Sequence, residues 1–211
     1  MDKNRCNSVG ITVRCCIFEW FMQQAIKKII QASITTKEKV LANEALQSEI
    51  EKVTSLIVSA FHNGNKVLFC GNGGSAADAQ HLAAEFSGRF YTDRNPLPSE
   101  ALHCNTSYLT AVANDYSFDI VYSRMVKGIG KRGDVLIGLS TSGNSVNIIK
   151  AVEQAKEIGM ITACFTGETG GKLKSICDHL INVPSIDTPR IQETHLMIGH
   201  IICQLVEEQL F

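Results

Sequence analysis

The sequence lacks several motifs that would assign it to well-known classes of binding protein. No pair of its eight cysteines has the CxxC spacing of zinc ribbons and thioredoxin-like sites. The phosphate-binding loop GxxxxGK followed by Ser or Thr is absent, and the glycine-rich turn Gly71–Ser75 lacks the GxGxxG spacing of a dinucleotide fingerprint. We therefore expect neither a cysteine zinc cluster nor a nucleotide cofactor.

An excess of either charge and a long apolar run are also missing. The chain has 20 basic and 21 acidic residues, so nucleic acid and anionic membranes are not favoured as main partners. No stretch approaches the roughly 18 apolar residues of a membrane-spanning helix. Four cysteines stand inside apolar runs, where a thiol behaves as a small hydrophobe, and we expect reduced core residues of a cytoplasmic protein. They are Cys70, Cys104, Cys164 and Cys203.

Residues 1–21 differ from the rest of the chain. They hold three cysteines and the single tryptophan, and they show no clear amphipathic period. The apolar run Cys15–Phe18 is too short for a signal peptide, is followed by Glu19 and precedes no small-residue cleavage site. We interpret residues 1–21 as an extension outside the domain, with residues 22–211 forming a single domain.

Apolar periodicity predicts two helices before the first strand. The first runs from Met22 to about Ile34, Thr35-Thr36 interrupts it, and the second covers about Lys37–His62. Both carry an apolar stripe that needs a partner, which favours self-association.

Five short apolar runs then alternate with helical segments. This alternation is typical of an α/β protein with a five-stranded parallel sheet and helices on both faces. Ligands of such sheets bind beyond the carboxyl ends of the strands. The expected strands are Val67–Cys70, Glu100–Cys104, Asp134–Leu139, Met160–Thr166 and His179–Val183, and the expected helices after the first strand end near Ser87, Ala113, Ile129, Ile158 and Leu210.

A glycine-rich turn, Gly71–Ser75, links the first strand to an alanine-rich helix. A strand–turn–helix unit aims backbone N–H groups at an anionic or hydroxylated ligand, although glycine-rich turns are common. On that helix His81 and Glu85 are four residues apart and share a face. Such a pair can chelate a metal or place a carboxylate base, and more often it is a solvated helix face.

Ser140–Ser145 supplies four hydroxyls at the start of a helix and contains no lysine or arginine. This pattern favours a phosphate monoester held by hydroxyls and helix dipole, and the alternative is a plain N-cap in a serine-rich turn. Late in the chain, Gln192 and His200 lie about two helical turns apart. A histidine in apolar surroundings is usually a core residue, so His200 gains a role only if it meets His81 and Glu85.

Four blocks in this order resemble the sugar isomerase (SIS) domain family: CGNGGSAADAQHLAAEFSGRF, AVANDYSFD, GDVLIGLSTSGNS and TPRIQETHLMIGH. The resemblance covers about Met22–Phe211. It implies a flavodoxin-like fold and a cytoplasmic homotetramer with active sites shared between subunits. It also implies interconversion of sedoheptulose 7-phosphate and D-glycero-D-manno-heptose 7-phosphate through an enediol(ate), the first step toward activated heptoses of surface lipopolysaccharide.

The resemblance also implies residue roles. Glu85 corresponds to the catalytic base and His200 to the catalytic acid/base. One zinc ion per subunit would be bound by His81, Glu85, Gln192 and His200. The implied substrate-binding residues are Asn72, Gly73, Gly74, Ser75, Arg89, Asn114, Asp115, Ser140, Thr141, Ser142, Ser145 and Gln192. Pro189 departs from the pattern, because some members carry an aspartate there.

Two other functions remain possible at this point. One is a non-catalytic SIS protein that binds the replication initiator, from which Gly74, Glu85 and His200 distinguish this chain. The other is a sugar-phosphate-sensing regulator, which would bring a DNA-binding domain, whereas nothing in residues 1–60 resembles a helix-turn-helix.

Overall fold

The computed structural model describes residues 6–211, with side chains from Phe21 onward. Five strands alternate with helices, which confirms the predicted α/β class. Within the described residues no helix is long and apolar enough to cross a membrane. The elements are α1 Cys6–Leu41, α2 Glu44–His62, β1 Val67–Gly71, α3 Gly74–Ser87, β2 Ser99–Ala101, α4 Thr106–Asp115, η1 Phe118–Ile120, α5 Val121–Ile129, β3 Val135–Leu139, α6 Val146–Ile158, β4 Ile161–Thr166, η2 Gly171–Ser175, β5 His179–Asn182 and α7 Thr188–Leu210.

The five strands form one sheet in the order β2-β1-β3-β4-β5, and every pair is parallel. The register sets Gly71 of β1 beside Leu139 of β3, and Leu139 beside Phe165 of β4. The loops that follow these strands therefore leave the sheet at one edge. The glycine turn and the Ser140–Ser145 loop become neighbours there.

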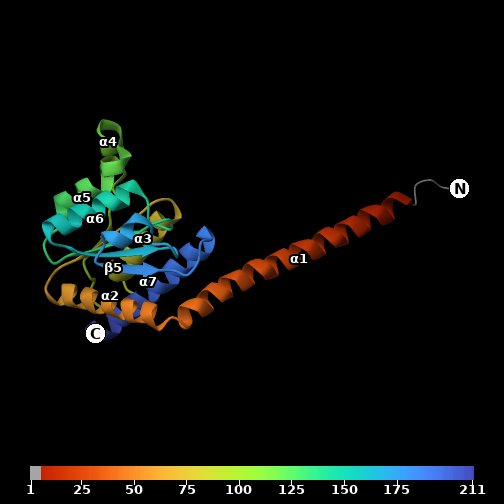
Figure 1. The fold of residues 1–211 in the computed structure, drawn as a ribbon, viewed down its shortest axis with the longest axis horizontal. Helices are drawn as coiled ribbons and strands as arrows, with labels where there is room; N and C mark the ends of the chain where they lie inside the picture. Colours follow the sequence, from red (N-terminus) through yellow and green to blue (C-terminus); the bar gives the residue numbers. More distant parts are fainter. Residues whose placement is uncertain (1–5) are drawn as a thin grey trace.

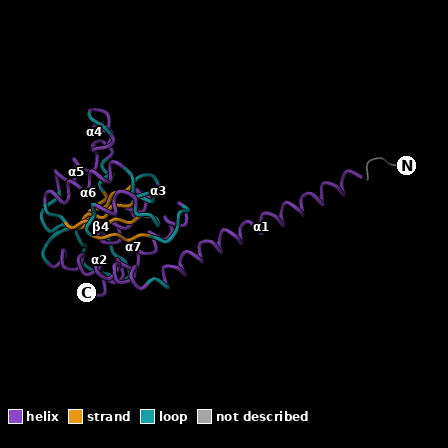
Figure 2. The backbone as a smooth tube through the Cα atoms, in the orientation of Figure 1, coloured by secondary structure: helices purple, strands orange, loops and turns teal. Residues whose placement is uncertain are grey.

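Helices cover both faces of the sheet (Figure 1; Figure 2 shows the strands enclosed by helices). Alternate residues of each strand point to opposite faces. Phe69 and Ile137 belong to a core shared with α2, α3 and α7, whereas Leu68 and Leu136 belong to a core shared with α5 and α6. Burial on both faces explains why β1 and β3 are continuous apolar runs.

The predicted interruption at Thr35-Thr36 is wrong. α1 continues through both residues to Leu41, and the Thr36 hydroxyl donates to the Ala32 carbonyl at 3.0 Å, so the side chain is satisfied within the helix. The break comes two residues after Leu41, where the Asn43 side chain accepts from the Leu46 N–H at 3.0 Å and caps α2.

Figure 1 shows α1 extending away from the body of the fold. Its contacts are with α2 and α7. The helix begins at Cys6, earlier than the expected start near Met22. The interpretation of residues 1–21 as an extension stays a prediction, because residues 1–5 and the side chains of residues 6–20 lie outside the described part.

Two further expectations need correction. β2 ends at Ala101, so Cys104 lies in the following turn and is exposed instead of in the core. The expected helix Phe118–Ile129 divides into the short turn η1 and α5. Cys70, Cys164 and Cys203 are buried free thiols, as predicted.

Candidate active site

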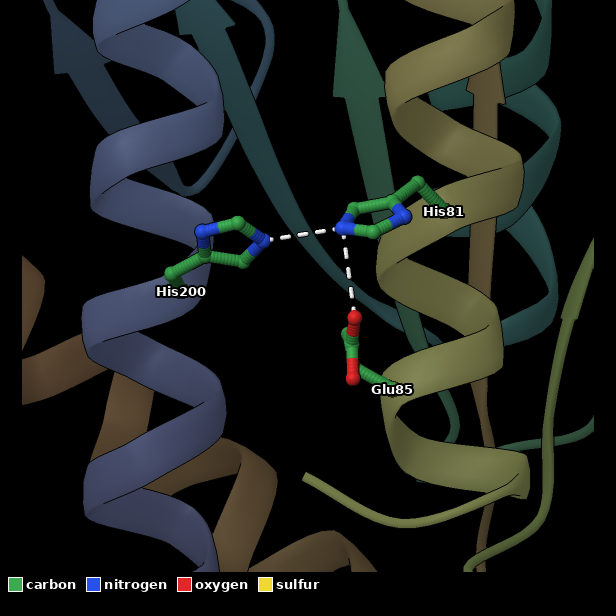
Figure 3. Close-up of side chains that lie close together, drawn as sticks. All are labelled: His81, Glu85 and His200. Carbon is green, nitrogen blue, oxygen red and sulfur yellow. Dashed lines mark hydrogen bonds and ion pairs between the residues drawn. The ribbon is translucent and has the colours of Figure 1, made fainter. Parts of the chain in front are cut away.

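Two helices bring together His81, Glu85 and His200 (Figure 3). His81 and Glu85 project from α3, and His200 projects from α7. The Nε2 atoms of His81 and His200 lie 2.9 Å apart, and His81 Nε2 lies 3.2 Å from Glu85 Oε1. The three side chains therefore meet, which was the condition for giving His200 a role, although His81 and His200 are 119 residues apart in the sequence.

The meeting depends on a glycine beside the histidine. A Cβ atom at Gly199 would stand 2.5 Å from both terminal carbons of Leu82, so α7 approaches α3 more closely than any side chain would allow. Leu82 is 1% exposed and Gly199 is buried in the same core. The sequence reading gave Gly199 no role, although a small residue beside a histidine in an apolar helix is a usable signal of close helix packing.

The arrangement fits a metal ion. One ligand atom from each of the three residues lies within 4.8 Å of the others. Zn–N bonds of about 2.0–2.1 Å in a tetrahedral site put ligand atoms roughly 3.3 Å apart, close to the distances between these side chains. Burial and then the neighbouring His81 lower the pKa of His200, only partly offset by Glu85, which favours the neutral imidazole that binds metals.

Gln192 lies at the glycine turn. A Cβ at Gly74 would be 2.7 Å from the Gln192 Nε2 atom, so the absence of a side chain at 74 lets the amide approach. Gly73, the N-cap of α3, has φ +55°, a conformation that glycine adopts readily. Gln192 thus connects α7 to the turn, and its place among the zinc ligands stays a prediction.

The loop after β3 forms a polar cradle. The hydroxyls of Ser140 and Ser145 are 2.9 Å apart, and Gly143 turns the chain at φ +65° against the Gly170 carbonyl. Ser145 caps α6 without a side-chain bond to it. A cavity of about 300 Å³ opens at this loop, and none of its lining residues is Lys or Arg. The lining is Thr141, Ser142, Asn144, Gly167, Glu168, Thr169, Ser185, Ile186, Thr188 and Ile191.

One buried residue in this region was missed. Asn147, on the first turn of α6, exchanges two side-chain hydrogen bonds with Asn72 of the glycine turn. Ser75 on that turn is buried. An asparagine inside the first turn of a helix that follows a hydroxyl-rich loop is the only signal the sequence offers for this contact.

Three predicted substrate residues are exposed at the surface of the chain. Arg89 is exposed, one residue beyond the C-cap Gly88 of α3. Asn114 donates its side-chain N–H to the Asp115 carboxylate at 3.0 Å, and both are exposed at the end of α4. Figure 1 shows α4 projecting from the body of the fold.

Comparisons with known proteins identify the family and the fold. The sequence profile of the SIS domain matches residues 30–167. A phosphoheptose isomerase of Aneurinibacillus thermoaerophilus is 56% identical over 190 residues, which are 90% of this chain and 96% of that protein. The solved phosphoheptose isomerase of Neisseria gonorrhoeae is 41% identical, with a TM-score of 0.83 and coverage of 89% of this chain and 99% of its own. That of Francisella tularensis is 35% identical, with a TM-score of 0.85 and coverage of 89% and 98%.

Proposed function

The chain belongs to the SIS domain family, and we propose that it is an isomerase that interconverts sedoheptulose 7-phosphate and D-glycero-D-manno-heptose 7-phosphate. The single observation that carries the proposal is the cluster in which the Glu85 carboxylate and the His200 imidazole both approach His81. Relatives named phosphoheptose isomerase match almost the whole of their own length. The alternative of a replication-initiator-binding protein receives no support from these relatives.

The reaction moves a proton between C1 and C2 of an open-chain sugar through an enediol(ate). Glu85 removes the proton from one carbon and returns it to the other, and His200 transfers a proton between the two oxygens. The hydroxyls of the Ser140–Ser145 loop and the N-terminal end of α6 hold the phosphate. The glycine turn, with Asn72 and Ser75, lines the sugar chain between these two points.

Zinc, one ion per subunit, is the proposed metal. His81, Glu85 and His200 fit it by distance, and Gln192 completes the proposed set. A bound zinc ion would stabilise the negative charge of the enediolate. We expect metal analysis of the purified protein to find about one zinc per chain, and His81→Ala to lower this content by at least tenfold.

A homotetramer with shared active sites is the proposed assembly. α1 exposes Ile26, Ile29 and Ile30, each about half accessible. A groove of about 570 Å³ follows between α1, α2 and α7, and seven of its eleven lining residues are apolar. Contiguous apolar surface of this kind marks an interface. Shared sites would also give a role to Asn114 and Asp115, which are exposed at the end of the projecting helix α4.

Light scattering after gel filtration tests the assembly. The wild type should have about four times the mass of one chain, and Ile30→Glu should reduce it by placing charge in the interface. The exposed Glu153→Gln on α6 serves as a control. A monomeric wild type would contradict this part of the proposal. A cytoplasmic location and a role in lipopolysaccharide heptose synthesis follow from the proposed substrate and belong to the same proposal.

The decisive experiment is conversion of sedoheptulose 7-phosphate by the purified chain in the presence of zinc, followed by NMR of the sugar carbons. We expect heptose 7-phosphate to form with the wild type and with Glu153→Gln, and its formation to be nearly abolished in His200→Gln. An inactive, folded wild type would overturn the enzymatic function.

A further inference from the structure

Asn147 is a buried polar residue that the mechanism above does not use. It is 3% exposed and stands on α6, two residues after Ser145 of the phosphate loop. Its Nδ2 donates to Asn72 Oδ1 at 2.8 Å, and Asn72 Nδ2 donates back to Asn147 Oδ1 at 2.9 Å. This reciprocal pair joins the glycine turn to the helix behind the phosphate loop across 75 residues of sequence.

A backbone group fixes the orientation of the pair. The Ile148 N–H donates to Asn147 Oδ1 at 3.0 Å, and a backbone N–H can only donate, so this atom must be the amide oxygen. The Asn147 nitrogen must then face Asn72 Oδ1. Consequently Asn147 determines which way the Asn72 amide points: Asn72 Oδ1 faces the Asn147 nitrogen, and Asn72 Nδ2 faces Asn147 Oδ1.

This orientation matters at the glycine turn. An amide has two N–H groups and two oxygen lone pairs. With one of each committed to Asn147, Asn72 keeps one donor and one acceptor in fixed directions. A donor and an acceptor side by side suit the hydroxyl groups of a sugar chain, since each hydroxyl can both donate and accept.

We propose that Asn147 is a positioning residue that sets the register between the bound phosphate and the reacting end of the sugar by locking Asn72. The proposal rests on the isomerase function stated above. A substrate held at its phosphate by the loop after β3 must present C1 and C2 to Glu85. An error of about 1 Å between these two points can cost on the order of 10²-fold in rate.

Asn147→Asp is the sharpest test, because it keeps the size of the side chain and the acceptor for Ile148 N–H. It removes the donor and turns a second oxygen toward Asn72 Oδ1. We expect kcat/KM to fall about 10- to 100-fold, mainly through kcat. The dissociation constant for inorganic phosphate should rise far less than kcat/KM falls, because the Ser140–Ser145 hydroxyls are unchanged. The buried carboxylate should lower the melting temperature, so the assays are run well below it.

A double-mutant cycle shows whether Asn147 acts through Asn72. In an Asn72→Ala background the change Asn147→Asp should have almost no additional effect on kcat/KM, because the group it orients is already missing. Asn63→Asp is the matched control, since Asn63 is exposed at the end of α2 and bonds only within that helix end. It should behave like the wild type.

If the wild type is active, two results would overturn the inference. One is a kcat/KM of Asn147→Asp within twofold of the wild-type value. The other is a double variant whose loss of kcat/KM equals the product of the losses in Asn72→Ala and Asn147→Asp. A loss of phosphate affinity as large as the fall in kcat/KM would also overturn it, because it would show general damage to the loop. An inactive wild type would remove the proposed function and this inference with it.

Discussion

Two glutamates on neighbouring helices meet opposite surroundings. Glu85 on α3 is partly exposed, and its carboxylate has the His81 ring at 3.2 Å. Glu207 on α7 is 4% exposed and accepts bonds from the N–H groups of Tyr91 at 2.8 Å and Thr92 at 2.7 Å. Its other oxygen accepts from Arg94 Nε at 2.9 Å and from the Phe90 N–H at 3.2 Å.

The difference separates the carboxylate proposed as the catalytic base from a structural one. Burial alone would raise the pKa of Glu207, but the backbone donors and Arg94 outweigh it and hold that pKa below its usual value. Every lone pair is occupied, so Glu207 has no capacity left for a substrate. Glu85 keeps oxygen lone pairs free of backbone donors beside the His81 ring, as a proton-transfer group needs.

The contacts of Glu207 and Arg94 also support the cluster of His81, Glu85 and His200. Arg94 donates to the main-chain carbonyls of Glu85 at 2.9 Å and Phe86 at 3.0 Å, which fixes the C-terminal end of α3. Phe90, whose N–H binds Glu207, places its ring 5.7 Å from that of His200. Arg94 and Glu207 therefore hold the end of α3 and Phe90 in place beside His81, Glu85 and His200.

The largest effect should come from Glu85→Gln. It removes the proton acceptor but leaves the fold, so kcat should fall about 10²- to 10⁴-fold while the melting temperature stays close to that of the wild type. Steady-state assays and thermal unfolding measure the two quantities. Glu153→Gln controls for loss of one charge. Substantial residual kcat in Glu85→Gln would contradict the assignment of the base.

Glu207→Gln should show the reverse pattern. Removing one charge of a buried, hydrogen-bonded pair leaves Arg94 without its partner and should cost about 3–5 kcal/mol of unfolding free energy. Urea unfolding at pH 7 measures this loss. Activity per folded molecule should fall far less than in Glu85→Gln. A stability loss below about 1 kcal/mol would mean that the loop at Phe90–Thr92 is held by other contacts.

Gly199→Ala should affect both properties. The added methyl group must push Leu82 and α3 away from α7, at a cost of about 1–3 kcal/mol, and should separate His81 from His200. We expect a lower melting temperature, weaker zinc retention and at least a tenfold loss of kcat/KM. Gly128→Ala in α5 is the matched control: a Cβ there meets nothing within 4 Å, so it should stabilise slightly.

The smallest effect is on the pH dependence of stability. Because the pKa of Glu207 is lowered on folding from its ordinary value of 4.5, its stabilisation is complete above pH 4.5 and is lost as pH falls through the folded pKa. The gap in unfolding free energy between wild type and Glu207→Gln should therefore be constant from pH 7 to about 5.5 and shrink below 4.5. Urea titrations at pH 7, 5 and 4 measure it, and a gap that widened on acidification would contradict this sign.

The fold was largely predictable because β1, β3 and β4 are buried on both faces and so read as uninterrupted apolar runs. The errors arose where local signals compete with tertiary contacts. Thr36 is a poor helix former by propensity, yet it satisfies its hydroxyl within α1. Cys104 follows an apolar stretch, yet β2 stops at Ala101 because the chain turns there.

The site could be predicted only in part, because it too depends on tertiary contacts. His81 and Glu85 could be paired from their spacing, because a helix fixes which residues share a face. The arrival of His200 depends on how α3 packs against α7, which Gly199 permits and no local pattern encodes. Asn147 was not predicted because only the parallel pairing of β1 with β3 brings it next to its partner Asn72.

The separation of His81 and His200 has a consequence for protein synthesis. α7, the 23-residue helix at the end of the described fold, carries His200 and Gln192. It also carries Glu207, which anchors the loop at Tyr91. A ribosome-bound chain that has exposed all five strands therefore still lacks His200, one half of the proposed acid/base pair. With the proposed roles, catalysis begins only after α7 has been made, and a chain cut before α7 would have the proposed phosphate loop without the means to isomerise its ligand.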